Sequence, residues 1–254
     1  MSPRTPISAF IVTLNEAAHL REALQSLDGV DEIIVVDSGS TDGTVDIAHE
    51  LGARVIHQDW LGFAGQKAFA LAQCRNEWCL NIDGDEVLSP EMLDELQALI
   101  ARNDCDVVRL RIEEFFMGAP MHPWSRKRHI VRCFKKSVVR YPSDRSVHEN
   151  VQYSGRVATT ASSLIHYGYD DLRTFMDKYS GYAQLKAADK FAQGKRGSLL
   201  KLLLIFPLSF TKVYLLRRLV LSGRRGLIQA YVEAMYAFLK EANLYQLGRI
   251  NRLR

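Results

Sequence analysis

Blocks of apolar and polar residues alternate along the first hundred positions of the chain. Apolar runs of strand length predict four buried strands: 7–14, 32–36, 53–57 and 78–82. Segments with helical spacing begin at Asn15, Thr41 and Phe63, and a fourth helix is expected with Ser89 as N-cap and Pro90 at its first position. Because strands that alternate with helices indicate βαβ units, we expect an α/β domain with a mostly parallel sheet flanked by helices.

The pattern changes twice in the rest of the chain. From 106 to 169 it indicates short strands and loops, and from 171 onward it is helical. We expect the second of three helices to be interrupted at Pro207, since proline breaks the helical hydrogen-bond ladder. The three helices are expected at 171–193, 199–222 and 225–242. The expected divisions are one domain over 1–170, with halves at 1–104 and 105–170, and a helical extension over 171–254.

Three of the predicted strands end in short polar stretches. These are Thr-Leu-Asn-Glu at 13–16, Asp-Ser-Gly-Ser at 37–40 and Asp-Gly-Asp-Glu at 83–86. In open α/β sheets, ligands bind beyond the carboxyl ends of the strands. Because the carboxyl ends of parallel strands share one edge of the sheet, we expect the three stretches to form a site together.

The stretch LNIDGDEVL places Asp83, Asp85 and Glu86 within four residues. Carboxylates this close raise each other's pKa unless a positive charge lies among them. A divalent cation would supply that charge, because Mg²⁺ is typically held by one or two carboxylates together with substrate phosphates. Gly84 permits a tight turn in which Asp83 and Asp85 face one ion, and that ion would then hold a diphosphate. The alternative is a solvated acidic turn.

Composition and charge add two constraints. With 254 residues, 47% of them hydrophobic, the chain can bury a substantial core. Its four cysteines lack disulfide-framework density and CxxC spacing, which favours a reducing, cytosolic setting, and we find no signal-peptide pattern at the N-terminus.

Residues 195–254 carry twelve Lys and Arg and two acids, whereas the preceding 194 residues carry 21 basic and 27 acidic residues. A basic tail on an acidic body indicates an anionic partner, either lipid or nucleic acid.

Three stretches together resemble the inverting family-2 glycosyltransferases: SAFIVTLNEAAHLREALQSL, EIIVVDSGSTDGTVDIAHELGARV and WLGFAGQKAFALAQCRNEWCLNIDGDEVLSPEML. The resemblance is dense over 7–100, and the run DRSVHE at 144–149 is similar to one in the lipopolysaccharide core β-1,4-glucosyltransferase subgroup. It implies the GT-A type of nucleotide-binding α/β fold, with a nucleotide-sugar half over 1–104 and an acceptor half over 105–170. It also implies metal-dependent transfer of a hexose, glucose from UDP-glucose, to a lipopolysaccharide-core or similar glycolipid acceptor.

The family pattern implies roles for the residues at the strand ends. Those expected to contact the nucleotide are Thr13, Asn15, Glu16, Asp37, Gln66, Lys67 and Asp83. Asp85 is implied as the principal ligand of Mg²⁺ or Mn²⁺, with Asp83 on ribose or metal and His166 completing the metal shell. Structural alternatives stay open for four residues: an Asx turn for Asp37, a helix N-cap for Asp42, a solvated lysine for Lys67 and a hydrogen-bonded core histidine for His166.

Inverting transfer requires a general base that takes the proton from the attacking acceptor hydroxyl. In the family a carboxylate beyond the β-rich middle segment does this work, and the resemblance therefore implies Glu149 as the base. Asp144 is the second candidate and His148 the third. An exposed loop with ion pairs to Arg145 is the alternative for this segment.

The basic stretch MHPWSRKRH at 121–129 fits an acceptor-binding loop. Trp124 would stack on a sugar, and Arg126 and Arg128 would meet phosphates of the acceptor, since guanidinium groups suit planar anions. An ordinary surface loop is the alternative. No nucleic-acid recognition motif accompanies the stretch, so we expect no nucleic-acid partner.

The most apolar segment of the chain begins at Leu199. Lys201, Pro207 and Lys212 break it, and it is shorter than the roughly 20 apolar residues of a spanning helix. An interfacial helix with cationic flanks fits better, on an anionic membrane surface that carries a lipid-linked saccharide acceptor. We therefore expect a cytoplasmic protein, peripheral on the inner face of the cytoplasmic membrane. A helical cap on the domain, or on another subunit of a homo-oligomer, is the alternative.

Two other functions compete with glycosyl transfer from a nucleotide-diphosphate sugar. A nucleotidyltransferase also places acids at strand ends, but it usually carries an early glycine-rich phosphate loop that VTLNEAAHL lacks. A non-catalytic nucleotide-sugar binding or scaffold protein would not need the intact Asp-Gly-Asp and a candidate base. The sequence therefore favours the glycosyltransferase.

Overall fold

The computed structural model describes residues 4–142, 151–169 and 172–250. The chain divides into two units, which are described separately below. The first comprises the described residues within 1–114, 127–144 and 148–167. The second comprises 115–126 and the described residues from 168 onward.

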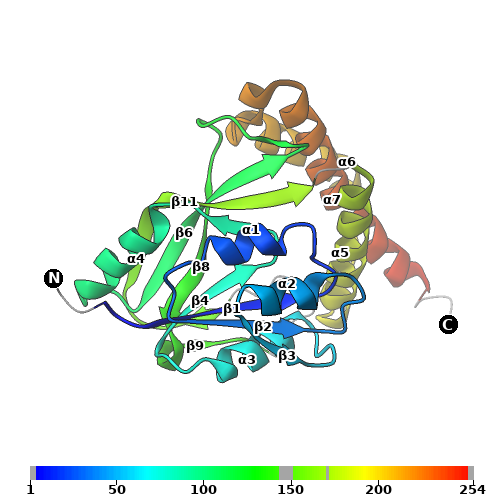
Figure 1. The fold of residues 1–254 in the computed structure, drawn as a ribbon. Coiled ribbons are helices and arrows are strands. Elements are labelled where there is room, and N and C mark those ends of the chain that lie inside the picture. Colours follow the sequence, from blue (N-terminus) through cyan, green and yellow to red (C-terminus); the bar gives the residue numbers. More distant parts are fainter. Residues whose placement is uncertain (1–3, 143–150, 170–171, 251–254) are drawn as a thin grey trace. The chain divides into compact units, whose positions relative to one another are not determined.

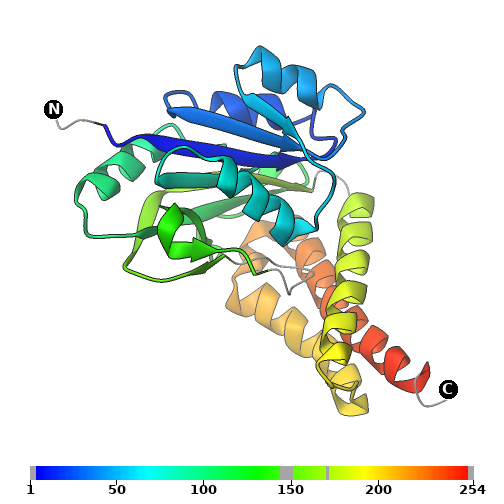
Figure 2. The same ribbon diagram turned by 90° about the horizontal axis from the view of Figure 1, so that it is seen from below.

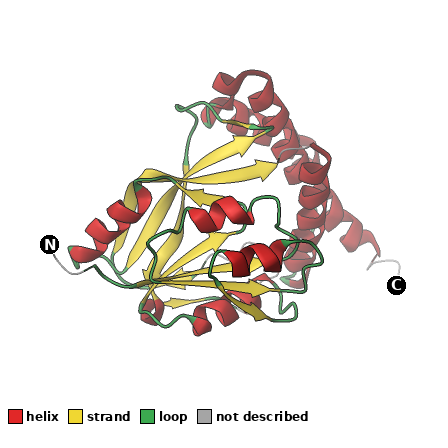
Figure 3. Cartoon of the chain, viewed as in Figure 1, coloured by secondary structure: helices red, strands yellow, loops and turns green. Residues whose placement is uncertain are grey.

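A mixed sheet forms the centre of the first unit (Figures 1 and 3). The described strands lie in the order β3-β2-β1-β4-β8-β6-β11-β5, and β7 pairs with the end of β6. Four strands are parallel: β1 (Ile7–Thr13), β2 (Glu32–Asp37), β3 (Arg54–His57) and β4 (Trp78–Asp83). The others are β5 (Glu86–Leu88), β6 (Val107–Phe116), β7 (Ala119–Pro120), β8 (Arg128–Lys135) and β11 (Val157–Tyr169).

The parallel sheet expected from the sequence is thus confined to the first four strands. β8 runs antiparallel to β4 and to β6, and β5 runs antiparallel to β11. These later strands carry alternating polar and apolar residues rather than continuous apolar runs, as antiparallel strands commonly do. A separate two-stranded sheet pairs β9 (Val139–Arg140) with β10 (Gln152–Tyr153).

Helices cover both faces of the parallel strands, because successive strand residues point to opposite faces. Ile7, Ala9 and Ile11 of β1 pack in one core with residues of three helices: α1 (Leu20–Gln25), α2 (Thr44–Glu50) and α4 (Met92–Ala101). Phe10 faces the other way, into a second core with residues of α3 (Phe63–Gln73). This three-layer arrangement, visible in Figure 1, confirms the α/β fold with flanking helices.

Several helix starts differ from the prediction, and two of them show why. The first helix begins at Leu20 rather than Asn15, because Asn15 adopts a left-handed backbone conformation with φ of 57°. The fourth begins at Met92, and Ser89 is not its N-cap: the Ser89 carbonyl accepts a hydrogen bond from the Met92 amide in a preceding turn. Both predictions read a turn as the first turn of a helix.

Long helices make up most of the second unit (Figure 2). They are α5 (Leu172–Ala192), α6 (Leu199–Thr211) and α7 (Gly223–Ile250), with a π-helical turn (Lys212–Leu216) and a 3₁₀ turn (Leu219–Ser222) between α6 and α7. The predicted break at Pro207 is wrong, because α6 continues through this residue. The break falls at Arg218, whose φ of 60° is left-handed.

An apolar core of its own supports this helical unit. It contains Phe116, Met121, Phe175, Val213, Leu219, Ala230 and Val232. Among the described residues, one segment is long and apolar enough to cross a membrane, Leu199–Leu216, with a mean hydropathy of 1.8. Only 6% of it is buried, so it does not serve as a core helix.

All four cysteines lie in the first unit, and all are buried as free thiols. Their positions are Cys74, Cys79, Cys105 and Cys133. This agrees with the absence of a disulfide framework expected from their spacing.

Candidate active site

Strand register brings the polar strand ends to one edge of the sheet. Thr13 at the end of β1 pairs with Asp37 at the end of β2, and Val12 pairs with Asp83 at the end of β4. The Thr13 hydroxyl donates to the Asp37 carboxylate at 3.2 Å. The three stretches predicted to converge therefore do so.

The loop after β1 is tied to the loop after β2. The Asn15 side-chain oxygen accepts a hydrogen bond from the Thr41 amide at 2.8 Å, and the Asn15 amide donates to the Ser40 hydroxyl at 2.9 Å. Asp42 accepts from the amide and hydroxyl of Thr44 and from the Ala17 amide. Asp42 thus forms a side-chain turn immediately before α2, whose N-cap is Gly43 rather than Asp42 as the structural alternative expected.

Asp37 organises the turn that follows β2. Its carboxylate accepts from the Thr13 hydroxyl, from the Gly39 amide and from both the amide and the hydroxyl of Ser40. Burial opposes ionisation, but these donors hold the pKa of Asp37 below its usual value. Four donors use the approximately four acceptor positions of a carboxylate, so a nucleoside contact would require one hydroxyl to turn away.

Gln66 and Lys67 are adjacent on α3 but lie in different surroundings. Gln66 is fully buried, and its amide donates to the Ser38 hydroxyl at 2.8 Å and to the Gln58 carbonyl at 2.9 Å. It therefore joins the loops after β2 and β3. Lys67 Nζ lies 2.8 Å from Asp83 Oδ1 and is not a solvated surface lysine, since its side chain is 15% exposed.

Two side-chain cations, rather than a metal alone, balance the acidic cluster. Arg132 on β8 donates to both Asp83 and Glu86, and Lys67 donates to the other oxygen of Asp83. Burial opposes ionisation of Asp83, but Arg132 and Lys67 hold its pKa well below the usual range. Burial raises the pKa of Glu86, a shift that Arg132 reduces and the Asp83 charge increases. Glu86 also accepts from the Asp83 amide at 3.0 Å, which fixes the turn.

Asp85 lies outside this buried ion-pair network and faces His166 instead. Asp85 Oδ2 is 3.6 Å from His166 Nε2, and the other ring nitrogen of His166 lies 2.8 Å from Glu114 Oε2. Pairing of β11 with β5 sets this geometry, because it places His166 directly opposite Glu86. Arg128 Nε in turn donates to Glu114 at 2.8 Å.

The two carboxylates strongly affect the charge of the histidine. Burial disfavours the imidazolium, but the interactions with the Asp85 and Glu114 carboxylates outweigh it and raise the pKa of His166 well above its ordinary value. Burial opposes ionisation of Glu114, yet His166 and Arg128 lower its pKa to about 2. Without a bound cation, the proton on His166 is therefore the positive charge beside Asp85.

These donors fit a divalent metal whose shell is completed by a substrate. Metal-binding histidines commonly donate their second ring nitrogen to a carboxylate, as His166 does to Glu114. The described part of the chain contains no group of three or more His, Cys, Asp or Glu that could hold an ion by themselves. Asp85 and His166 alone would leave most coordination positions to phosphate oxygens and water, as Mg²⁺ sites at nucleotides do.

Sequence reasoning did not identify two residues of this site. Arg132 follows Asp83 by 49 residues and lies on an antiparallel strand, where its alternation with Val131 and Cys133 reads as an ordinary strand pattern. Glu114 adjoins Glu113 in an acidic pair at the end of β6, and nothing in the sequence selects one of the two. A buried arginine in an apolar run was the available signal for Arg132, because such a charge requires a partner.

Three of the remaining predicted residues fall outside the described residues, and the others are described one by one. The candidate bases Glu149, Asp144 and His148 fall within 143–150 and are outside the described residues. Trp124 is 73% exposed and Arg126 is exposed, both in the second unit, while Arg128 is engaged by Glu114 in the first. Glu16 stands beside Gly84, where an added Cβ would lie 3.1 Å from Glu16 Cβ and Cγ.

Comparison with known proteins agrees with this geometry. The model of the family described as glycosyl transferase family 2 matches residues 8–152. The lipopolysaccharide core biosynthesis glycosyltransferase LpsC of Rhizobium meliloti (strain 1021) is 36% identical over 255 residues, covering 97% of this chain and 94% of LpsC. An uncharacterised glycosyltransferase of Rickettsia felis is 35% identical over 251 residues, covering 94% of this chain and 89% of the relative.

Solved structures share the fold at low sequence identity. The crystal structure of S. aureus TarS 1–349 has a TM-score of 0.52 and 17% identity, covering 96% of this chain and 92% of TarS 1–349. Its complex with UDP-GlcNAc gives 0.51 and 16%, with the same coverage. The matched family model, the near-full-length relatives and the convergent strand ends lead to one conclusion: the chain is a glycosyltransferase and belongs to glycosyl transferase family 2.

Proposed function

We propose that this enzyme transfers a hexose, glucose from UDP-glucose, to a lipopolysaccharide-core or similar glycolipid acceptor with inversion, using Mg²⁺ or Mn²⁺. The name of LpsC supports the acceptor class, and the UDP-GlcNAc bound by TarS supports a UDP-linked donor. The lipid-linked acceptor would place the enzyme in the cytoplasm, peripheral on the inner face of the membrane. The proposal rests on one observation: at the carboxyl-terminal edge of the sheet, the two ring nitrogens of His166 face the carboxylates of Asp85 and Glu114.

In this proposal, Asp85 and His166 hold the cation, and Glu114 orients the His166 ring. The cation would act as a Lewis acid that stabilises the charge developing on the departing nucleoside diphosphate. When His166 becomes a ligand, it gives up the proton that its two carboxylate neighbours otherwise hold there. Metal binding should therefore release a proton, and donor binding should weaken in acid.

Asp83 has a separate task in this scheme. Lys67 and Arg132 keep it ionised and fixed, and its side chain is 35% exposed at the strand-end edge. We propose that it accepts a hydrogen bond from a ribose hydroxyl, with Thr13, Asn15, Glu16 and Asp37 around the nucleoside. Gln66 supports this pocket by joining its loops, and Lys67 acts through Asp83.

The acceptor hydroxyl requires a base on the opposite side of the sugar. We propose Glu149 for this role, with Asp144 and His148 as the other candidates, and Trp124, Arg126 and Arg128 as acceptor contacts. A positioned base typically contributes about 10²–10⁴-fold in rate. Glu149→Gln should therefore bind donor normally while turnover falls by about that factor. Unchanged turnover would exclude Glu149 and direct attention to Asp144.

Calorimetric titration with UDP, GDP and ADP, each with and without Mn²⁺, tests the donor and the metal together. We expect tight binding of UDP that needs Mn²⁺ and is lost in Asp85→Asn. Asp94→Asn on α4 is the matched control and should bind as the wild type does. Binding of UDP that is equal with and without Mn²⁺ would contradict metal dependence, and tight binding of GDP or ADP instead would contradict the donor.

A further inference from the structure

One side of α6 and of the following π-helical turn is exposed and almost wholly apolar. We call this side the leucine face, and it consists of Leu199, Leu200, Leu203, Leu204, Leu208, Leu215 and Leu216. These side chains are exposed by between 44% and 71%. Soluble surfaces rarely expose so many leucines side by side without a partner, because each exposed leucine forgoes the free energy of burial.

The opposite side of α6 is already occupied by α7. Phe206 and Phe210 of α6 pack against Tyr231 of α7, with ring centroids 5.1 and 5.9 Å apart. The leucine face is therefore the outer side of a helix whose inner side belongs to the core of this unit. A segment fixed along one side in this way lies on a surface rather than crossing a bilayer.

Positive charge accompanies the leucine face. Lys201 and Lys212 are exposed within it, and Arg218 and Arg224 are exposed just beyond it. The two acids of residues 195–250 are both engaged: Glu233 with Arg217 and Glu241 with the Ser198 amide. The local charge is thus strongly positive, and the partner that would neutralise it is anionic.

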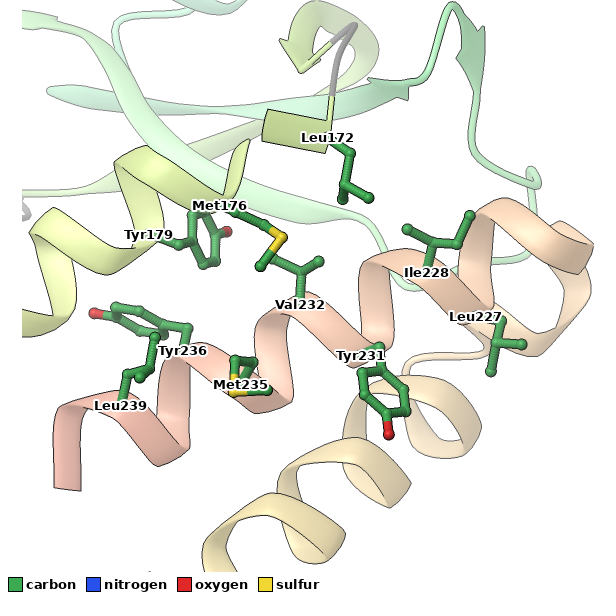
Figure 4. Close-up of a pocket in the computed structure, with 10 residues that line it drawn as sticks. All are labelled: Leu172, Met176, Tyr179, Leu227, Ile228, Tyr231, Val232, Met235, Tyr236 and Leu239. Carbon is green, nitrogen blue, oxygen red and sulfur yellow. The ribbon is translucent and has the colours of Figure 1, made fainter. Parts of the chain in front are cut away.

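The same unit contains an apolar groove. It has a volume of ≈ 360 Å³ and lies between α5 and α7, with Leu172 and Met176 on one side and Val232 on the other (Figure 4). Tyr231 lines this groove and also contacts Phe206 and Phe210 on the inner side of α6. Figure 4 shows Tyr231 pointing away from α5.

We propose that the leucine face binds one leaflet of an anionic lipid bilayer, with α6 in the plane of the interface and an acyl chain in the groove between α5 and α7. Exposed leucines flanked by Lys and Arg, with the nearby acids already paired, are what such an interface requires. A second copy of this chain would bring the same cations together, which like-charge repulsion disfavours. The inference deepens the proposed function, since it names the surface by which a glycolipid transferase would reach its acceptor.

Co-sedimentation of the full chain with vesicles tests this proposal without donor, metal or acceptor, so its failure is independent of the catalytic proposal. We expect binding to vesicles of equal parts phosphatidylglycerol and phosphatidylcholine, weak binding to phosphatidylcholine alone, and loss at high salt. Lys201→Gln with Lys212→Gln should lower the partition coefficient by about fivefold per charge. Leu200→Gln with Leu203→Gln should lower it by about tenfold or more per leucine.

Matched controls separate this surface from general effects of substitution. Leu185→Gln on α5 removes an equally apolar, exposed leucine, and Arg102→Gln after α4 removes an exposed cation. Both should bind vesicles as the wild type does, and retained circular dichroism would show that all variants fold. Equal binding to phosphatidylcholine vesicles, or binding unaffected by the leucine substitutions, would overturn the proposal.

Contact with the acyl region has its own readout. A Tyr231→Trp variant should show fluorescence quenching by bromine-labelled acyl chains, in excess of that shown by the wild-type chain. Quenching no greater than in the wild type would restrict binding to headgroups and overturn the groove assignment. A soluble oligomer that Leu200→Gln and Leu203→Gln dissociate, with vesicle binding unchanged, would assign the leucine face to a second copy instead.

Discussion

Arg132 holds two carboxylates in place and is itself 10% exposed. Removal of one member of a buried ion pair leaves an uncompensated charge, which typically costs about 3–5 kcal/mol. We therefore expect Arg132→Met to lower the free energy of unfolding by about that amount, measured by urea denaturation. Arg102→Met after α4 removes an exposed arginine and should change stability by less than about 0.5 kcal/mol. Equal losses in both variants would contradict a special role for Arg132.

Gly84 is the point at which the acidic turn approaches the loop after β1. A Cβ there would lie 3.1 Å from two atoms of Glu16, so Glu16 would have to move. We expect Gly84→Ala to weaken UDP binding in the presence of Mn²⁺, with overpacking that costs about 1–3 kcal/mol of stability at most. Gly43→Ala is the control, because its Cβ would meet Ala17 at an ordinary 3.9 Å. Calorimetry that shows equal UDP affinity in both variants would contradict the prediction.

Asp106 holds together the start of β6, the end of β8 and the start of β11. Its carboxylate accepts from Lys135 Nζ at 2.8 Å, from the Arg156 amide at 3.0 Å and from Arg156 Nε at 3.2 Å. Hydrogen bonds from Lys135 and Arg156 hold the pKa of Asp106 well below its usual range. Because the folded-state pKa is depressed, this contribution to stability is complete above the unfolded pKa, about 3.9, and is lost as pH falls below it.

Asp106→Asn should therefore destabilise the protein at pH 7, and its difference from the wild type should shrink as the pH is lowered through about 4. Urea denaturation of both proteins across this range measures the difference directly. Asp104→Asn, two residues earlier and exposed, serves as the control. A difference that stays constant from neutral pH to below about 3 would show that packing, rather than charge, accounts for the effect.

Local patterns were sufficient for the parallel strands and the later helices, because their apolar spacing matches the structure they adopt. They failed where tertiary contacts override local preference. Asn15 reads as a helix start, but hydrogen bonds to Ser40 and Thr41 hold it in a left-handed turn. Pro207 reads as a break, yet α6 continues through it.

The same distinction between local pattern and tertiary contact applies to the residues of the site. Asp83 and Asp85 could be found because they are adjacent in sequence and stand at the end of an apolar strand. Arg132 could not be paired with Asp83, nor Glu114 with His166, since those contacts depend on which antiparallel strands become neighbours. Sequence spacing carries no information about that order.

Over the whole molecule, donor binding should be visible as thermal stability. A ligand at about 100 times its dissociation constant stabilises the folded state by about 2.7 kcal/mol. UDP with Mn²⁺ should therefore raise the melting temperature by several degrees, and EDTA should abolish the increase. Asp85→Asn should show no increase with either addition. An increase caused by UDP in the presence of EDTA would mean that the nucleotide binds without a cation.

The four cysteines provide the chain with an internal reporter of motion. Hydrogen bonding to Cys74 together with burial raises the pKa of Cys79, and burial raises that of Cys105 and Cys133, so these thiols stay protonated and unreactive while the fold is closed. Every cysteine belongs to the first unit. The rate of thiol alkylation should therefore report the opening of the sheet of the first unit, independently of motions of the helical unit.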